Sequence, residues 1–346
     1  MNSFQDTLLS APSVREAVAS AADKGAGYLV ADAAVAALYP GIEEACRTLG
    51  MHFLALADAP RKSLGEAAAV WRFLSSEGAR RDSVVALAGG GSLTDAGGFA
   101  AATFKRGIDY INIPTTLLAA VDASVGGKTG VDFGGLKNEV GAFRLPLATV
   151  LCGEWLRTLP HSEIMSGYGE MLKTAFLQGE REASAMMRQG GFPGMQLVES
   201  CARFKLGVVE RDPFEKGERR ILNLGHTAGH AFESLCRARG CEVSHGAAVA
   251  QGLLVSLILS HMREGLDAKW VSSFAALLRE EFAPVRFGCR DYPALLELMR
   301  HDKKNLSDGG ISFVLLRVPG EPLCGIQPAE NEICAALDIT ADSLGF

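Results

Sequence analysis

Short apolar runs alternate with longer helical patterns over the first 150 residues of the chain. The runs that we predict to be strands are residues 28–31, 53–57, 84–88, 110–113 and 148–151. Between several of them, as at 64–75 and 93–104, apolar residues recur at helical spacing. This alternation predicts a parallel sheet wrapped by helices, with a ligand site beyond the carboxyl ends of the strands.

After Pro160 the pattern changes to long helical segments. The helices predicted there are residues 162–178, 197–210, 228–239 and 246–263, and residues 311–317 form one late strand candidate. The change in pattern places a domain boundary near residues 155–165. We therefore predict an α/β domain over residues 1–160 and a mostly helical domain over residues 161–346.

Composition excludes several classes of protein. Of the 346 residues, 48% are hydrophobic and 21% charged, which is typical of a globular chain. The net charge of −6 argues against a nucleic-acid partner, which would require a basic surface. No apolar run reaches the length of a membrane span, and the N-terminus lacks the pattern of a signal peptide. We expect a cytoplasmic protein that binds a small molecule.

Eight cysteines are scattered along the chain without a Cys-x-x-Cys pair. In a long chain without an export signal, this pattern favours reduced, mostly buried thiols over a disulfide framework or a zinc ribbon.

A glycine triplet follows the predicted strand 84–88, in the sequence Gly89-Gly90-Gly91-Ser92-Leu93-Thr94-Asp95. Glycines allow the backbone to approach a ligand closely, and the N-terminus of the next helix offers N–H groups to a phosphate. The spacing differs from the usual dinucleotide fingerprint. The alternative interpretation is a tight turn between a strand and a helix.

A second glycine-rich stretch, residues 121–130, contains Lys128 and is followed by Lys137 and Asn138. Two lysines in such a loop suit an anionic ligand. The stretch is not a P-loop, because Ala123 stands where the first glycine of that motif would be. The alternative is a solvated loop with no ligand.

Three of the seven histidines lie within twenty residues of one another, at His226, His230 and His245. Imidazoles are the commonest zinc ligands, and a catalytic zinc usually has three protein ligands. Spacing alone predicts His226 and His230 as ligands, because residues four apart share a helical face. The alternative is that these are packed or solvated histidines. Among the acidic candidates, Glu170 stands out because its sequence neighbours are small or apolar.

Read together and in order, these motifs resemble the 3-dehydroquinate synthase family of sugar phosphate cyclases. The matching stretches include residues 89–107, Pro114-Thr115-Thr116-Leu117-Leu118, 122–130, Lys137-Asn138, 167–173, 222–230 with Glu233, His245-Gly246 and His301-Asp302-Lys303-Lys304. The resemblance implies an α/β chain in which an N-terminal Rossmann-like NAD domain precedes a mostly α-helical metal-binding domain.

The reaction that the resemblance implies is a carbon–oxygen lyase step of the shikimate pathway, in the biosynthesis of aromatic amino acids. 3-Deoxy-D-arabino-heptulosonate 7-phosphate becomes 3-dehydroquinate and phosphate through transient oxidation by NAD+, elimination of phosphate, reduction and an intramolecular aldol closure. The implied cofactors are NAD+ and a divalent metal, zinc or cobalt.

The resemblance also implies roles for individual residues. The divalent metal falls on Glu170, His226 and His245, which leaves His230 to handle protons or to support the ligands. The substrate-binding and catalytic residues of the family match Lys128, Asn138, Lys173, Lys205, Arg219, Asn223, His230, Arg106 and Lys303. Its NAD-binding residues match Asp32, Lys62, Gly89, Gly90, Gly91, Ser92, Leu93, Thr94, Asp95, Thr115, Thr116, Asp122, Lys128, Lys137, Trp155, Leu156, Arg157 and Thr158. Arg106 resembles an arginine that reaches the substrate phosphate of a neighbouring subunit, which implies a homodimer.

Three positions depart from the family pattern. Of the usual Gly-Glu-x-x-Lys segment only Lys62 matches, which affects the adenosine end of NAD. Thr94 stands where glycine is common, so a side chain must fit beside the turn. Ala247 replaces the usual glutamate after His245-Gly246 and alters the surroundings of the metal site.

Three other functions remain open at this point. An NAD-dependent polyol or alcohol dehydrogenase would also have a glycine turn and a histidine-bound metal, but it would release NADH stoichiometrically. Another sugar phosphate cyclase would act on a related substrate. A non-catalytic NAD- or metabolite-binding regulator would not need the full set of metal and substrate residues.

Overall fold

The computed structural model describes residues 4–57, 62–190, 194–300 and 310–346. Contacts divide the chain into two compact units. Unit 1 comprises Met1–Pro160 and Val198–Phe214, and unit 2 comprises His161–Leu197 and Glu215–Phe346.

Unit 1 is built on a parallel sheet of the order β1-β8-β5-β4-β2-β3. Its strands are β1 (Leu8–Ala11), β2 (Ala26–Asp32), β3 (His52–Leu56), β4 (Val84–Gly89), β5 (Asp109–Pro114) and β8 (Ala148–Cys152). Its helices before Pro160 are α1 (Val14–Asp23), α2 (Ala33–Leu38), α3 (Gly41–Thr48), α4 (Leu64–Ser76), α5 (Gly91–Thr103) and α6 (Leu117–Val121). The predicted parallel sheet with helices is confirmed.

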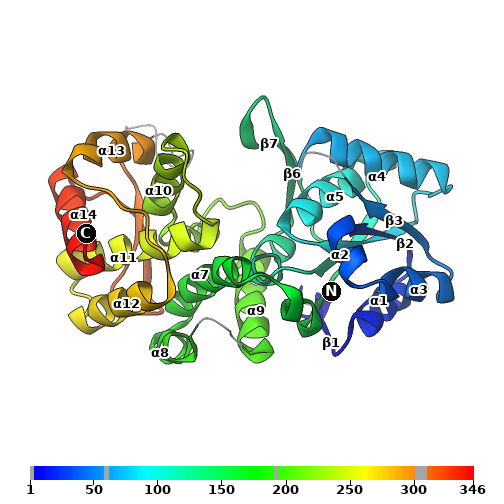
Figure 1. The fold of residues 1–346 in the computed structure, drawn as a ribbon, viewed down its shortest axis with the longest axis horizontal. Coiled ribbons are helices and arrows are strands. Elements are labelled where there is room, and N and C mark those ends of the chain that lie inside the picture. The colour runs from blue at the N-terminus through cyan, green and yellow to red at the C-terminus, as the bar shows by residue number, and fades with distance from the viewer. Residues whose placement is uncertain (1–3, 58–61, 191–193, 301–309) are drawn as a thin grey trace. The chain divides into compact units, whose positions relative to one another are not determined.

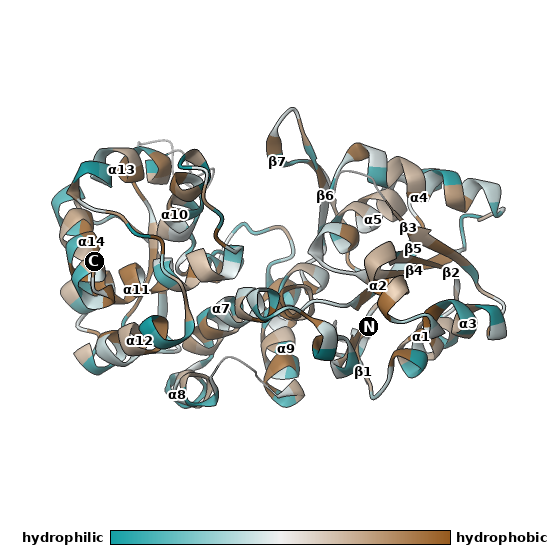
Figure 2. Cartoon of the chain, in the orientation of Figure 1, coloured by the Kyte–Doolittle hydropathy of each residue, from teal (hydrophilic) through white to brown (hydrophobic). Residues whose placement is uncertain are grey.

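Helices cover both faces of this sheet (Figure 1). Along β2, Leu29 packs in a cluster with α1 and α3, whereas the next residue, Val30, packs with α4 and α5. This alternation follows from the two-residue period of a strand. The central strands β2, β4 and β5 are predominantly hydrophobic (Figure 2), as expected for strands that are buried on both faces.

Part of the glycine-rich stretch of residues 121–130, which is interpreted as a loop from the sequence, belongs to a β-hairpin. The strands β6 (Lys128–Phe133) and β7 (Leu136–Phe143) pair antiparallel. Nearly all of β7 is exposed, so it lacks the alternation of apolar and polar residues by which a half-buried strand is detected.

Unit 2 is mostly helical. Its helices are α7 (His161–Gln178), α8 (Glu180–Gln189), α10 (His226–Ala238), α11 (His245–Glu264), α12 (Ala268–Glu281), α13 (Tyr292–Arg300) and α14 (Glu330–Leu344), and its strands are β9 (Phe313–Leu316) and β10 (Pro322–Ile326). Among the described residues, α11 alone is long and apolar enough to cross a membrane, but 78% of its most apolar stretch is buried. It is the core helix of unit 2.

The helix α9 (Met195–Arg211) follows residue 160, where the sequence predicts the start of the second domain, but most of it does not belong to unit 2. From Val198 onward it belongs to unit 1. Glu199 accepts a hydrogen bond from Ser10, and the Nζ atom of Lys205 lies 2.5 Å from Oδ1 of Asp122. A helical pattern shows that α9 has an apolar face, but it cannot show which unit that face packs against.

The expectation that all cysteines are thiols is wrong for one pair. Cys236 and Cys241 form a disulfide. Cys236 lies in the last turn of α10, and the chain reverses at Gly240, whose φ is +67°, so that the two Cα atoms are 5.0 Å apart. A spacing of five residues does not predict this disulfide, because its formation depends on where helix α10 ends. Of the free cysteines, three are buried, at Cys46, Cys152 and Cys201.

Candidate active site

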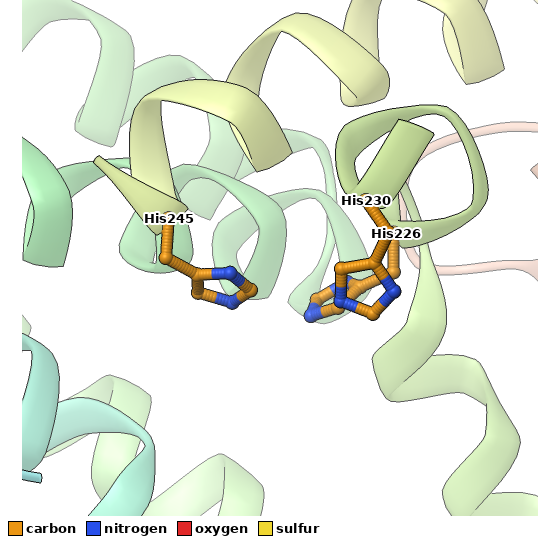
Figure 3. Close-up of side chains that lie close together, drawn as sticks. All are labelled: His226, His230 and His245. Carbon is orange, nitrogen blue, oxygen red and sulfur yellow. The ribbon is translucent and has the colours of Figure 1, made fainter. Parts of the chain in front are cut away.

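Three helices of unit 2 bring an acidic residue and three histidines together. Glu170 lies on α7, His226 and His230 lie on α10, and His245 is the first residue of α11, where the Ser244 side chain caps the helix. Figure 3 shows the imidazoles of His226 and His230, from one helix, facing the same space as His245 from the start of another. The ring centroids are 5.3–5.8 Å apart.

Backbone contact between helices fixes this arrangement. A Cβ atom on Gly246 would lie 1.7 Å from the carbonyl oxygen of Ser166, and one on Gly169 would lie 2.0 Å from the carbonyl oxygen of Gly246. Helices α7 and α11 therefore touch through their backbones beside Glu170 and His245. This close approach holds the two side chains in place before any ligand binds.

Glu170 is 1% exposed and forms a buried ion pair with Lys173. Its Oε1 atom lies 3.5 Å from Nε2 of His226 and 3.4 Å from Nε2 of His245, yet it has no hydrogen-bond partner. Burial alone would raise the pKa of Glu170, but the charge of Lys173 and the contact with His245 hold it well below its usual range. An anionic oxygen that is buried beside two imidazoles suits a divalent cation.

His230 belongs to the same cluster. Ring nitrogens of His226, His230 and His245 all lie within 4.8 Å of one another. The structure thus brings together both ligand pairs under consideration, His226 with His230 from spacing and His226 with His245 from the resemblance. Only the second set uses the carboxylate oxygen of Glu170 that has no hydrogen-bond partner.

His245 contacts two carboxylates. Besides Glu170, Glu233 places its Oε2 atom 3.3 Å from Nδ1 of His245. Burial would lower the pKa of His245, but these two acidic neighbours raise it to about 9. Glu233 is not among the residues to which the sequence assigns a role. Its signal is its spacing of seven residues from His226, which puts both on one face of α10.

In unit 1, the glycine triplet makes the turn between β4 and α5. A Cβ atom on Gly90 would lie 3.1 Å from the Thr116 side chain, and the amide of Thr115 donates to the carbonyl oxygen of Gly89. The chain goes from β2 to one edge of the sheet and then returns to the other side of β2 with β4. The ends of these strands, with Asp32 and the glycine turn, form the topological switch point at which such sheets bind ligands.

The Thr94 side chain fits beside the turn because it is buried and its hydroxyl donates to the carbonyl oxygen of Gly91. Asp32 accepts from the amide of Ala34 and so caps α2. Trp155 and Leu156 are buried, whereas Thr158 is exposed and shares a hydrogen bond with Tyr39.

Asp95 lies one helical turn into α5 and forms an ion pair with Lys62, with a distance of 2.5 Å between Nζ and Oδ2. Burial raises the pKa of Asp95, and the charge of Lys62 opposes that rise. Lys62 thus partly offsets the cost of burying this carboxylate beside the glycine turn. The four residues before it, Asp58-Ala59-Pro60-Arg61, lie outside the described residues.

Replacing Lys62 with alanine is expected to lower the free energy of unfolding by about 1.5–3 kcal/mol at neutral pH, because Asp95 loses its charge-assisted hydrogen bond. The folded-state pKa of Asp95 is already raised and would rise further. A group with a raised folded pKa loses its stabilising contribution as pH rises through that value. The deficit should therefore shrink on acidification, as measured by urea denaturation at several pH values. Lys269→Ala breaks an ion pair with Asp267 in which both side chains are more than half exposed, and it should leave the free energy of unfolding essentially unchanged. A deficit for Lys62→Ala that does not change with pH would contradict this account.

The remaining substrate residues implied by the resemblance are divided between the units. Arg106, Lys128, Asn138 and Lys205 belong to unit 1, as do the implied NAD residues Asp122 and Lys137. Lys173, Arg219, Asn223 and His230 belong to unit 2. Lys205 contacts both the side chain and the carbonyl oxygen of Asp122. Lys303 lies outside the described residues.

Family models match most of the chain. The model described as the 3-dehydroquinate synthase N-terminal domain matches residues 53–166, and the one for the C-terminal domain matches residues 167–305. The 3-dehydroquinate synthase of Parabacteroides distasonis is 45% identical over 285 residues, which are 81% of this chain and 80% of that protein. The 3-dehydroquinate synthase of Thermococcus kodakarensis is 42% identical over 286 residues, 82% of this chain and 80% of that protein.

Solved structures share the fold. The 2-epi-5-epi-valiolone synthase of Streptomyces hygroscopicus, with NAD+ and Zn2+ bound, has a TM-score of 0.79 and 26% identity and covers 97% of this chain and 96% of its own. A 2-deoxy-scyllo-inosose synthase, complexed with carbaglucose-6-phosphate, NAD+ and Co2+, has a TM-score of 0.81 at 23% identity, with the same coverage. A glycerol dehydrogenase from Schizosaccharomyces pombe has a TM-score of 0.67 at 16% identity and covers 97% of this chain and 89% of its own, so it shares the fold alone.

Proposed function

Because this chain belongs to the 3-dehydroquinate synthase family, we propose that it converts 3-deoxy-D-arabino-heptulosonate 7-phosphate to 3-dehydroquinate and phosphate in the shikimate pathway. The observation that carries the proposal is the buried Oε1 of Glu170, which lies close to two imidazoles and has no hydrogen-bond partner. Most buried polar atoms have a hydrogen-bond partner, so a buried carboxylate oxygen that has none, beside two imidazoles, is best explained by a metal ligand role.

Glu170, His226 and His245 are the residues that would hold a divalent metal, zinc or cobalt. When bound, the metal would supply a Lewis acid for substrate oxygens, and NAD+ would supply a reversible hydride acceptor. Lys173 supports the site by pairing with Glu170, which keeps that carboxylate ionised. His230 lies beside the ligands and would transfer protons during the reaction.

The turn at Gly89, Gly90 and Gly91 would hold the NAD+ pyrophosphate at the N-terminus of α5, where the helix dipole favours negative charge. Asp32, at the end of β2, and Asp95, after β4, lie at the same end of the sheet and would accept hydrogen bonds from ribose hydroxyls of NAD+. The lysine and arginine side chains implied by the resemblance would offset the charge of the anionic substrate, a role of positioning and electrostatic stabilisation.

The test of the proposed function is a turnover experiment with NAD+ far below the substrate concentration. A synthase regenerates NAD+ within each cycle, so many phosphates and dehydroquinates should form per NAD+, with no accumulation of NADH absorbance. One NADH released per substrate consumed would instead identify a dehydrogenase. Dehydroquinate must be detected separately, because another cyclase would release phosphate and form a different ring.

We further propose a homodimer in which Arg106 acts on the substrate of the partner subunit. Arg106 is exposed. Both Arg106 and the preceding Lys105 have positive φ angles, of 73° for Arg106 and 50° for Lys105. Arg106→Ala should raise KM and slow turnover, because a charge-assisted contact with phosphate is lost.

Mixing Arg106→Ala with Lys173→Ala subunits tests this arrangement directly. Each mixed dimer would contain one intact site, so an equal mixture should recover about a quarter of the wild-type activity if subunits exchange freely. No recovery in dimers shown to be mixed would mean that Arg106 serves its own subunit.

A further inference from the structure

Glu233 lies on the same face of α10 as the clustered histidines, three residues after His230 and seven after His226. Its side chain is 15% exposed. One carboxylate oxygen, Oε1, lies 3.3 Å from the guanidinium of Arg237, and the other, Oε2, lies 3.3 Å from Nδ1 of His245. Each carboxylate oxygen of Glu233 thus has its own partner, and Oε2 is the oxygen that faces the imidazole of His245.

The two nitrogens of His245 face different carboxylates. Nε2 lies 3.4 Å from Glu170, and Nδ1 lies 3.3 Å from Glu233. A neutral imidazole carries one proton, and the nitrogen without it is the one that can bind a metal. An acceptor at Nδ1 keeps the proton there and leaves the lone pair on Nε2.

His226 shows the same arrangement with a different acceptor. Its Nδ1 atom lies 3.2 Å from the carbonyl oxygen of Leu224, which can only accept a hydrogen bond, and its Nε2 atom lies 3.5 Å from Glu170. Both imidazoles thus have an acceptor at Nδ1 and direct Nε2 towards the same buried oxygen. For His226 the acceptor is backbone, whereas for His245 it is a side chain that can be replaced.

We infer that Glu233 is a positioning residue, which fixes the Nδ1–H tautomer and the ring orientation of His245 so that Nε2 is available to a divalent metal. The inference rests on the metal ligands proposed above, Glu170, His226 and His245. A carboxylate behind a metal-binding imidazole also increases the basicity of the ligand, and removal of such a partner typically costs 10–100-fold in metal affinity.

The experiment measures Co2+ binding to the metal-free full-length protein by the visible absorbance of the bound ion, without NAD+ or substrate. Glu233→Gln keeps the shape of the side chain and removes its charge, and should weaken Co2+ binding at least about tenfold. Glu233→Ala should weaken it further. Arg237→Ala is the matched control, since Arg237 is 63% exposed and contacts only the far oxygen of Glu233 among the contacts described above. It should change Co2+ affinity less than about threefold.

Two outcomes would overturn the role of Glu233 in a protein that binds the metal. The first is a folded Glu233→Gln protein, as judged by circular dichroism, that binds Co2+ as tightly as the wild type. The second concerns the wild-type protein loaded with zinc, in which nitrogen NMR of labelled histidines should show His245 protonated at Nδ1 and coordinated at Nε2. Protonation at Nε2 and coordination at Nδ1 would contradict the inference. This measurement decides the matter even if the Glu233 variants fail to fold.

Failure of the proposed function gives a different result. If the wild-type protein makes no dehydroquinate but Glu233→Gln weakens Co2+ binding, the positioning role of Glu233 stands and the synthase assignment is wrong. A wild-type chain that binds no Co2+ contradicts both the ligand set and the role of Glu233.

Discussion

His245→Ala is expected to abolish tight metal binding and to lower kcat by about 10³-fold or more, because a three-ligand site that loses one imidazole cannot retain its Lewis acid. The substitution removes the contacts with Glu170 and Glu233, but it leaves Ser244 to cap α11. The chain should therefore stay folded. Metal content after dialysis and turnover of the heptulosonate phosphate are the two measurements.

The matched control is His261→Ala. His261 lies at the other end of α11 and contacts the carbonyl oxygen of Leu266, so its loss should leave metal content unchanged. Full metal occupancy in His245→Ala would contradict the proposed ligand set and would favour His226 with His230.

Gly246→Ala is expected to destabilise unit 2 by about 3 kcal/mol or more, because the new methyl group would overlap the backbone of α7 and overpacked sites cannot simply relax. The added Cβ would lie 1.7 Å from the carbonyl oxygen of Ser166. Helices α7 and α11 must then separate beside Glu170 and His245, so metal affinity should fall together with the urea midpoint.

Gly41→Ala provides the comparison, because nothing lies within 4 Å of the Cβ that it adds. Alanine also has the higher helix propensity at this first residue of α3, so the variant should be as stable as the wild type or slightly more stable. If Gly246→Ala matched Gly41→Ala in stability, helices α7 and α11 would not touch as described.

The sequence predicted the elements of unit 1 well where burial imposes a period. The predicted strand 84–88 is β4 (Val84–Gly89), and the predicted helix 64–75 is α4 (Leu64–Ser76). Strand β1 (Leu8–Ala11) and the hairpin β6–β7 were not predicted. Four residues at the edge of a sheet, or an exposed hairpin, carry too few alternating apolar positions to be distinguished from a loop.

For the site, the sequence supplied the residues but not their arrangement. Local spacing related His226 to His230, because both lie on α10. It could not relate either of them to His245 or Glu170, which lie on other helices and reach the cluster through the contact between Gly246 and Ser166. The resemblance supplied that grouping. The disulfide between Cys236 and Cys241 depends on the exact end of α10, which periodicity does not define.

Because α9 returns the chain to unit 1, unit 1 cannot be completed, on the ribosome or in a gene fragment, without part of unit 2. Unit 1 stops at Pro160 and resumes at Val198, so Asp122 finds its partner Lys205 only 83 residues later. A ribosome that has delivered the first 160 residues has produced the whole parallel sheet, but not the helix that pairs with Asp122. The shortest gene fragment that encodes all of unit 1 ends at Phe214 and carries His161–Leu197 of unit 2 as an unavoidable insert.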